Sequence, residues 1–382
     1  MRIAIVCPYY PWPPSVGGVE TIVRNVSIEL AKRGHEVHVV TTPFDVTTQK
    51  QVTDFDMEER NGVIIHKLKP GNVKIGYARF LKGLKETIER IKPEVVHSHN
   101  LHPHLFQLAR WKSGIGYKLI AELHHPAIEL DFMIQKLAMP FAAMGLKLVS
   151  GAIDIFVAHT TLEKEWLSSK GIHSNKIALV RFPAIPSKLV GYEACSMNLG
   201  DIVYLGRIVY RKGLHVLLKA LSIAKQHFNE IKASIAGPSD PRYLKSLKKL
   251  INKLRLENNV FLVGTVAEEK KYEFIKSHKI FVLPSLKEYT PGVLLEAQAL
   301  GIPVIATNTG AVSEMMINGI TGILVKPSDE LELAKAMKML LKDDRLRRSF
   351  SIKAREFVKN FTLEKTVNKL EKLYYLLLEE SH

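Results

Sequence analysis

Two glutamates lie on either side of an expected helix start in the segment PSLKEYTPGVLLEAQALGIPVIA, residues 284–306. Glu288 lies in a loop after the apolar run KIFVL, and Glu296 lies about one turn inside the helix. Free N–H groups at a helix N-terminus bind anions. Carboxylates instead accept hydrogen bonds from hydroxyl groups. The segment therefore predicts a ligand that carries both phosphate and hydroxyl groups, such as a phosphorylated sugar.

A cluster of cations lies in the turn GRIVYRKG, residues 206–213, between an expected strand and an expected helix. In α/β sheets this is a position that faces phosphate. A chance cluster of charge on a surface loop would explain the turn alone. It does not explain Arg207 and Lys212 together with the two glutamates in the same half of the chain.

Alternating strands and helices must position these side chains. Residues 2–6 and 35–41 form apolar strands, and residues 19–32 form an amphipathic helix between them. Such a unit predicts a parallel sheet with its ligand at the carboxyl ends of the strands. Gly17 and Gly18 precede the helix, where the missing Cβ atoms would let backbone N–H groups approach a phosphate. Two adjacent glycines also fit a simple turn.

Length and periodicity predict an α/β protein with two domains, because 382 residues exceed one ordinary core. Hydrophobic periodicity lapses between residues 181 and 200, and a second series of strands and helices follows. We place the first domain at residues 1–182, a linker at 183–200, the second domain at 201–360 and a C-terminal helix at 361–382.

Histidines collect after two neighbouring strands. These histidines could bind a metal, contact a sugar hydroxyl or phosphate, or have purely structural roles. No acidic ligand is spaced to complete a metal site and no H-E-x-x-H pattern occurs, so we predict none. The histidines concerned are His97, His99, His102, His104, His124 and His125.

Composition is that of a globular protein, with 46% hydrophobic and 24% charged residues. No apolar run reaches the roughly 18 residues that a spanning helix needs. The N-terminal segment is typical of a buried strand rather than a signal peptide. Cys7 and Cys195 match neither a disulfide framework nor a metal spacing, which favours the cytoplasm.

The formal charge of +16 predicts anionic partners, which could be nucleic acid, an anionic membrane or phosphorylated substrates. A lysine-rich solvated surface would give the same charge. The apolar residues 131–149 fit a kinked core helix or an exposed surface for a lipid-linked acceptor. The basic amphipathic residues 242–255 favour an ordinary core-packed helix over a membrane-binding one.

Over nearly its whole length the chain resembles the retaining GT-B glycosyltransferases of family 4. The resemblance rests on these segments, in this order: GGVETIVRNVSIELAKRGHEVHVVT, EVVHSHN, VYLGRIVYRKGLHVLLKAL, SIAGPSD, VFLVGTV and EYTPGVLLEAQALGIPVIATNTGAVSEMMINGITGILVKPSD. It implies two Rossmann-like domains with parallel sheets that face each other across a cleft. The second domain would bind most of a nucleotide-sugar, and the C-terminal helix would cross back to the first.

The resemblance implies a role for each matching residue. Glu296 is similar to the glutamate that holds the ribose hydroxyls, and Glu288 to the one that contacts the transferred sugar. Arg207 and Lys212 resemble the pair that binds the diphosphate and stabilises the leaving group. The Gly17 and Gly18 loop would meet the diphosphate from the first domain.

His124 aligns with the cleft histidine near the 6-hydroxyl of the sugar, and we assign His99 and His125 to the acceptor side. Glu122 stands where the family often has threonine.

The family's frequent phenylalanine-glycine pair is replaced by Thr290 and Pro291, and Pro291 has no N–H to donate. Gly292, Val293 and Leu294 would then complete the donor-binding turn. Residues 182–184, Phe-Pro-Ala, replace a proline-asparagine-glycine turn.

The resemblance implies a retaining transferase that moves a hexosyl unit from a UDP- or GDP-sugar to a hydroxyl acceptor. The acceptor could be a lipid-linked sugar, a glycan or a small molecule. Front-side attack would need no enzyme nucleophile, and the two cations would take the part of a metal, so we expect no cofactor and no obligatory metal.

The alternatives are a non-hydrolysing sugar-nucleotide epimerase and a basic nucleic-acid-binding protein. No aromatic-rich basic patch or helix-turn-helix signature supports a nucleic-acid partner. We expect a cytoplasmic protein, with peripheral contact at the anionic inner membrane face as an open alternative.

Overall fold

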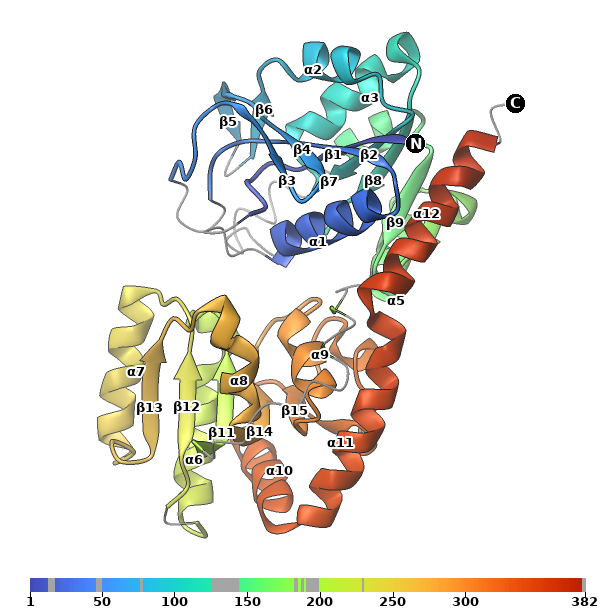
Figure 1. Cartoon of the computed structure of the whole chain (residues 1–382). Coiled ribbons are helices and arrows are strands. Elements are labelled where there is room, and N and C mark those ends of the chain that lie inside the picture. The colour runs from blue at the N-terminus through green and yellow to red at the C-terminus, as the bar shows by residue number, and fades with distance from the viewer. Residues whose placement is uncertain are drawn as a thin grey trace. The chain divides into compact units, whose positions relative to one another are not determined.

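In the computed structural model, the chain divides into two α/β units (Figure 1). Unit 1 comprises Met1–Ala184 and Leu363–His382, and unit 2 comprises Ile185–Thr362. The structure describes residues 1–12, 18–45, 50–75, 78–124, 144–181, 185–186, 189, 199–228 and 230–379. Gly17, His125, Cys195, residues 182–184 and most of the apolar stretch 131–149 lie outside the described residues.

Unit 1 is built on an eight-stranded sheet with the order β10-β9-β8-β7-β1-β2-β4-β3, in which only the edge strand β3 is antiparallel. The strands are β1 (Arg2–Val6), β2 (Glu36–Thr41), β3 (Met57–Arg60), β4 (Val63–Lys67), β7 (Val95–His99), β8 (Lys118–Glu122), β9 (Ile155–Ala158) and β10 (Ile177–Leu179). A separate hairpin joins β5 (Pro70–Ile75) to β6 (Ala78–Leu81). The predicted parallel sheet is therefore present in this unit.

Helices cover both faces of this sheet (Figure 1). Ile3 and Ile5 face one side and Ala4 and Val6 the other, as the two-residue period of a strand requires. Helices α1 (Gly18–Lys32) and α12 (Leu363–Glu379) pack on the first face. On the second face lie α2 (Leu84–Ile91), α3 (Pro103–Ile115) and α5 (Thr161–Ser169); a 3-10 turn, η1 (Ser174–Lys176), precedes β10.

Unit 2 has a six-stranded, fully parallel sheet with the order β13-β12-β11-β14-β15-β16. Its strands are β11 (Gly200–Leu205), β12 (Ala233–Ala236), β13 (Val260–Gly264), β14 (His278–Leu283), β15 (Val304–Thr307) and β16 (Gly322–Val325). Its helices are α6 (Leu214–Lys225), α7 (Pro241–Lys253), α8 (Lys271–Lys276), α9 (Gly292–Ala299), α10 (Glu330–Lys342) and α11 (Asp344–Val358). Short 3-10 turns are η3 (Tyr210–Lys212), η4 (Glu268–Lys270), η5 (Val312–Glu314) and η6 (Lys359–Phe361).

The basic helix α7 is core-packed, as its periodicity predicted. Leu247 and Ile251 are buried in the core of unit 2, and the side chain of Asp240 caps the first turn. No helix among the described residues is both long enough and apolar enough to cross a bilayer. The hairpin β5-β6 was not predicted, and α2 begins after it at Leu84.

Candidate active site

The cation-bearing turn of unit 2 lies against the end of β14 because of one glycine. Gly213 ends η3 with φ +65°, and a Cβ atom there would lie 2.0 Å from the carbonyl oxygen of Pro284. The backbone N–H of Leu286 donates to the carbonyl of Arg211 at 2.8 Å. This close approach of two backbones brings Lys212 to the loop that carries Glu288.

Lys212 and Glu288 form an ion pair, and only 12% and 8% of their side-chain surfaces are exposed. The hydroxyl of Ser285 donates to the same carboxylate oxygen at 3.0 Å. Burial lowers the pKa of Lys212 against the pull of Glu288. Burial opposes ionisation of Glu288, but the neighbouring Lys212 outweighs it and holds the pKa of that carboxyl below its usual value. The sequence predicted both residues separately, and the structure places them in contact.

Arg207 lies near this pair. Its side chain is exposed, and its carbonyl accepts a hydrogen bond from the hydroxyl of Tyr204 at 2.8 Å. Its charge, with that of Arg211, further disfavours the ammonium form of Lys212 and adds to the effect of burial on the Lys212 pKa. Repulsion among these cations is what a bound diphosphate would relieve.

Glu296 lies on α9 and pairs with Lys271, whose Nζ is 2.6 Å from Oε1. Burial opposes the charge of Lys271, but the Glu296 carboxylate outweighs it and raises the Lys271 pKa. Among the described residues, no hydrogen bond reaches the buried Oε2 of Glu296. One oxygen is thus held in place and the other remains an acceptor for a ligand hydroxyl. Sequence reasoning missed Lys271, which begins a different helix.

The first turn of α9 has Pro291 at its N-cap and no side-chain cap. The N–H of Leu294 donates to the carbonyl of Pro291 at 3.0 Å, and the Leu294 side chain is fully buried. Gly292 and Val293 therefore supply the N–H groups of this turn that a ligand can use. Thr290, just before the cap, is half-buried.

A second glycine holds the loop of Glu288, and sequence reasoning missed it. Gly310 has φ +58°, and a Cβ atom there would lie 1.9 Å from the carbonyl oxygen of Glu288. The adjacent Ala311 N–H donates to the carbonyl of Tyr289 at 3.1 Å. The loop after β15 thus packs directly on the backbone of Glu288. A glycine followed by an apolar residue gave no local signal of this contact.

The predicted glycine loop of unit 1 is only partly described. Gly17 lies outside the described residues, and Gly18 is the first residue of α1. A Cβ atom on Gly18 would meet nothing within 4 Å, so no close packing demands glycine there. Its predicted contact with a diphosphate stays a prediction.

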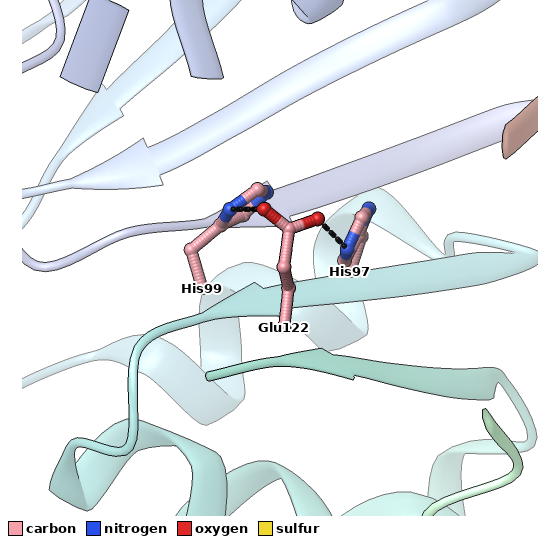
Figure 2. Close-up of side chains that lie close together, drawn as sticks. All are labelled: His97, His99 and Glu122. Atoms are coloured by element: carbon pink, nitrogen blue, oxygen red, sulfur yellow. Dashed lines mark ion pairs between the residues drawn. The ribbon is translucent and has the colours of Figure 1, made fainter. Parts of the chain in front are cut away.

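The histidines of unit 1 surround a buried glutamate at the carboxyl ends of three adjacent strands. His99 ends β7, and its Cα pairs in register with that of Glu122, which ends β8. His124 follows β8 with φ +48°, and His159 follows β9. Figure 2 shows the Glu122 carboxylate between the rings of His97 and His99, with one oxygen directed to each.

The expectation that no acidic residue is placed to complete this group was wrong, because Glu122 reaches all four rings. Its Oε1 lies 2.7 Å from His124 Nε2, 3.1 Å from His159 Nε2 and 3.2 Å from His99 Nδ1. Its Oε2 lies 3.2 Å from His97 Nε2. His159 had been overlooked, although it is the first polar residue after its strand, which is the signal that identified the others.

The pKa values of the residues in this group are shifted in different directions. Burial opposes ionisation of Glu122, but the surrounding imidazoles hold the pKa of its carboxyl well below the usual value. Burial lowers the pKa of His99 to about 4, whereas the charge of Glu122 overcomes burial and raises the pKa of His159 to about 9. The Nδ1 of His159 faces the Val180 carbonyl at 3.1 Å, and the Nδ1 of His97 faces the Tyr374 hydroxyl of α12 at 2.8 Å.

The other histidines have structural surroundings. His104 is fully buried, and its Nε2 lies 2.9 Å from the carbonyl of His99. His102 precedes α3 at its N-cap, and burial lowers its pKa to about 4. His125 lies outside the described residues, so its assignment to the acceptor side stays a prediction.

Two family models match the chain. One, described as glycosyl transferases group 1, matches residues 197–357, and the other, described as Glycosyltransferase Family 4, matches residues 16–181. The chain is 25% identical over 389 residues to the N-acetyl-alpha-D-glucosaminyl L-malate synthase of Bacillus anthracis, covering 100% of this chain and 98% of that enzyme.

Solved structures share the fold. Sucrose-phosphate synthase from Thermosynechococcus elongatus superposes with a TM-score of 0.80 at 20% identity, over 99% of each chain. The Anabaena protein HepE in complex with UDP gives a TM-score of 0.76 at 16% identity, over 98% of this chain and 99% of that one. These similarities confirm the predicted α/β class with two Rossmann-like domains.

Proposed function

Because the chain belongs to the family 4 glycosyltransferases with the GT-B fold, we propose that it moves a hexosyl unit from a UDP- or GDP-sugar to a hydroxyl acceptor with retention of configuration. The observation that carries this proposal is the buried pair of Lys212 and Glu288 beside the start of α9. A UDP-sugar is the first donor to test, because HepE was solved in complex with UDP-glucose.

The ion pair is suited to a ligand that has both an anion and hydroxyl groups. Without the donor, Lys212 and Glu288 neutralise each other in a buried setting. A bound diphosphate gives the ammonium a second anionic partner, and sugar hydroxyls can donate to the Glu288 carboxylate. Arg207 adds a further cation on the exposed side. The N–H groups of Gly292 and Val293 at the start of α9 complete the anion site.

Glu296 is suited to hold the ribose of the donor. Lys271 fixes one oxygen of the carboxylate by an ion pair. The other oxygen is buried without a hydrogen bond from the described residues, and a ribose hydroxyl would satisfy it. Loss of this acceptor should weaken binding of any nucleoside diphosphate, whatever sugar it carries.

In the proposed reaction, the bond between the anomeric carbon and the diphosphate oxygen breaks, and its electron pair stays on the diphosphate. The acceptor oxygen forms the new bond on the same face of the sugar. The acceptor proton passes to the departing phosphate. Lys212 and Arg207 stabilise the negative charge that grows on the leaving group, and one such fixed donor is worth on the order of 10²- to 10³-fold in rate.

We propose that this charge stabilisation replaces a metal ion at the diphosphate. Added Mg²⁺ or Mn²⁺ should then change the initial rate by less than about twofold. A rate that rises steeply with either ion would contradict this part of the proposal.

The proposed acceptor is a hydroxyl compound, and a lipid-linked sugar at the inner face of an anionic membrane is one candidate that the +16 charge supports. Sedimentation with vesicles that contain anionic lipid, compared with neutral vesicles, tests this form of the proposal. Equal sedimentation with both would contradict it.

Thermal unfolding in the presence of UDP-, GDP- and ADP-sugars tests the donor. A ligand at 100 times its Kd stabilises the folded protein by about 2.7 kcal/mol, so the bound donor should raise Tm. Product analysis by proton NMR then reads the anomeric configuration. A chain that neither binds nor hydrolyses any nucleotide-sugar would overturn the proposal.

Two variants separate the roles. Glu296→Gln should weaken binding of UDP alone as much as binding of the UDP-sugar, because it removes a charged acceptor for ribose. The matched control is Glu257→Gln, which changes an exposed glutamate in the loop after α7 and should leave affinity unchanged. Equal effects of the two variants would refute the role of Glu296.

A further inference from the structure

One group of side chains in unit 1 is not used in the donor-binding proposal above. We define the histidine–glutamate cluster as Glu122 and the four histidines whose nitrogens lie within ion-pair distance of its carboxylate: His97, His99, His124 and His159. The Glu122 side chain is 1% exposed and that of His124 7%. These residues come from the ends of β7, β8 and β9.

Strand periodicity places four members of the cluster on one face of the sheet, and His124 joins them from the turn after β8. Val95, Ile120 and Val157 belong to the core on the side of α1 and α12. Residues two or four positions further along each strand point the same way. Glu122 and His159 follow Ile120 and Val157 by two, and the β7 histidines follow Val95 by two and four. The convergence is therefore built into the register of three parallel strands.

A buried carboxylate in this place needs a positive partner. Among the residues that the structure describes, every ion-pair partner of Glu122 is an imidazole, and neither lysine nor arginine reaches it. An isolated buried charge is costly unless it is paired or coordinates a metal. Within the described residues, the charge of Glu122 is therefore balanced either by a protonated imidazole or by a bound cation.

The contacts are short, and two of the ring nitrogens also lie against each other: Nδ1 of His99 is 2.9 Å from Nε2 of His124, a hydrogen bond that a bound ion would replace. Four nitrogens lie 2.7 to 3.2 Å from the two oxygens of Glu122. Yet within the described part of the chain neither oxygen receives a hydrogen bond of acceptable geometry. Ring nitrogens that crowd one carboxylate oxygen and one another are what a set of metal ligands shows, because their lone pairs point at the ion between them.

The spacing of the donor atoms fits a zinc-sized ion. Ligands about 2.0 to 2.1 Å from a tetrahedral zinc lie about 3.3 Å apart, and the centres of bound imidazole rings about 5 Å apart. Here Oε1 of Glu122 lies 2.7 to 3.2 Å from three ring nitrogens. The ring centre of His124 lies 5.2 Å from that of His99 and 4.9 Å from that of His159. Shifts of a few tenths of an ångström would seat the ion.

Outer contacts orient the rings as they do around known metal ligands. His159 points its Nε2 at the cluster because its Nδ1 faces the Val180 carbonyl at 3.1 Å. His97 lies on the other oxygen of Glu122 and is held in turn by the Tyr374 hydroxyl (Figure 2). Metal-bound histidines and carboxylates commonly have such second partners, which fix the tautomer and the ring angle.

We propose that the histidine–glutamate cluster binds one divalent ion of the zinc class. The ligands are Glu122 Oε1, His99 Nδ1, His124 Nε2 and His159 Nε2, and His97 supports the carboxylate from its other oxygen. Four protein ligands make a closed, structural site rather than one with an open position for substrate. The ion ties β7, β8 and β9 together at their carboxyl ends. The ion would bind Nε2 of His124. This ring nitrogen would then be unavailable to a sugar hydroxyl.

Metal content tests this proposal without any turnover. The purified full chain, expressed in zinc-supplemented medium and passed over a chelating column, should carry about one zinc per chain by elemental analysis. Cobalt exchanged into the site should give the intense visible absorption of tetrahedral coordination. Less than about 0.1 equivalent of any transition metal, with no rise of Tm on adding zinc, would overturn the proposal and leave the cluster as a proton-held ion pair.

Variants locate the ion. Glu122→Gln and His159→Gln should each weaken zinc affinity by more than about 100-fold, because each removes a direct ligand. The matched control is His66→Gln, which changes a buried histidine on β4 of the same sheet and should keep full zinc content. If a cluster variant fails to fold, the cobalt spectrum of the unchanged chain decides alone. Zinc retained at full affinity in both cluster variants would refute the assignment.

Discussion

Replacing Lys212 by methionine should destabilise unit 2 far more than loss of an ordinary surface charge. The ammonium is the principal partner of Glu288, a carboxylate with only 8% of its side chain exposed. Methionine fills a similar volume but has no charge. The Glu288 carboxylate then keeps only the Ser285 hydroxyl and the more distant Arg211 as favourable partners. Removal of one member of a buried ion pair typically costs about 3 to 5 kcal/mol, against less than about 1 kcal/mol at the surface.

The double variant Lys212→Met with Glu288→Gln identifies the cause. Glutamine keeps an acceptor for Ser285 and carries no charge, so most of the lost stability should return. The pH dependence gives a second signature. In the unchanged chain the Glu288 pKa is lowered, so its contribution is present above the unfolded value near 4.5 and is lost only as the pH falls through the folded pKa.

In Lys212→Met, burial acts on Glu288 without the ammonium and raises its pKa above the unfolded value. The folded state then binds more protons than the unfolded state, so the free energy of unfolding falls as the pH rises above about 4.5. Urea unfolding at several pH values measures both effects. A single variant within about 1 kcal/mol of the unchanged chain, or a double variant no more stable than the single one, would refute the reasoning.

Three further changes test the surrounding structure. Gly213→Ala should cost more than about 2 kcal/mol in urea unfolding and weaken donor binding, because its Cβ would lie 2.0 Å from the Pro284 carbonyl oxygen at φ +65°; an alanine variant of full stability would contradict this. Lys271→Met should weaken UDP binding about tenfold or more by freeing Glu296 from its fixed position, and unchanged calorimetric affinity would count against it. Burial and nearby cations lower the His66 pKa to about 4, so the free energy of unfolding should fall as the pH drops from about 6.5 towards 4, by at most about 1.4 kcal/mol per pH unit; a His66→Leu variant with the same slope would exclude this residue as a source.

The sequence by itself determined the alternation of elements and the kinds of residue at the donor site. Apolar runs of five or six residues, amphipathic stretches of 3.6 period and terminal glycines are local signals, and each specifies its element without knowledge of the rest. The carboxyl ends of parallel strands gather polar residues, so Glu288, Lys212 and His99 were identified from position alone. The buried strands and α7 appear where these signals placed them.

Only the tertiary structure decided which of these residues touch. Lys212 meets Glu288 because Gly213 lets its turn lie on the backbone at Pro284, and Lys271 meets Glu296 from another helix. Neither contact leaves a trace in local periodicity, because it depends on the order of strands in the sheet and on the paths of the connecting loops.

The histidine–glutamate cluster shows the same division. His97, His99 and His124 were visible as histidines at or after a strand end, but the sequence does not state that β7, β8 and β9 are neighbours in register. That order places Glu122 opposite His99 and brings His159 to the same oxygen. The interaction of a buried charge with its partners depends on their distance in space and on the low dielectric around them. It does not depend on their separation along the chain.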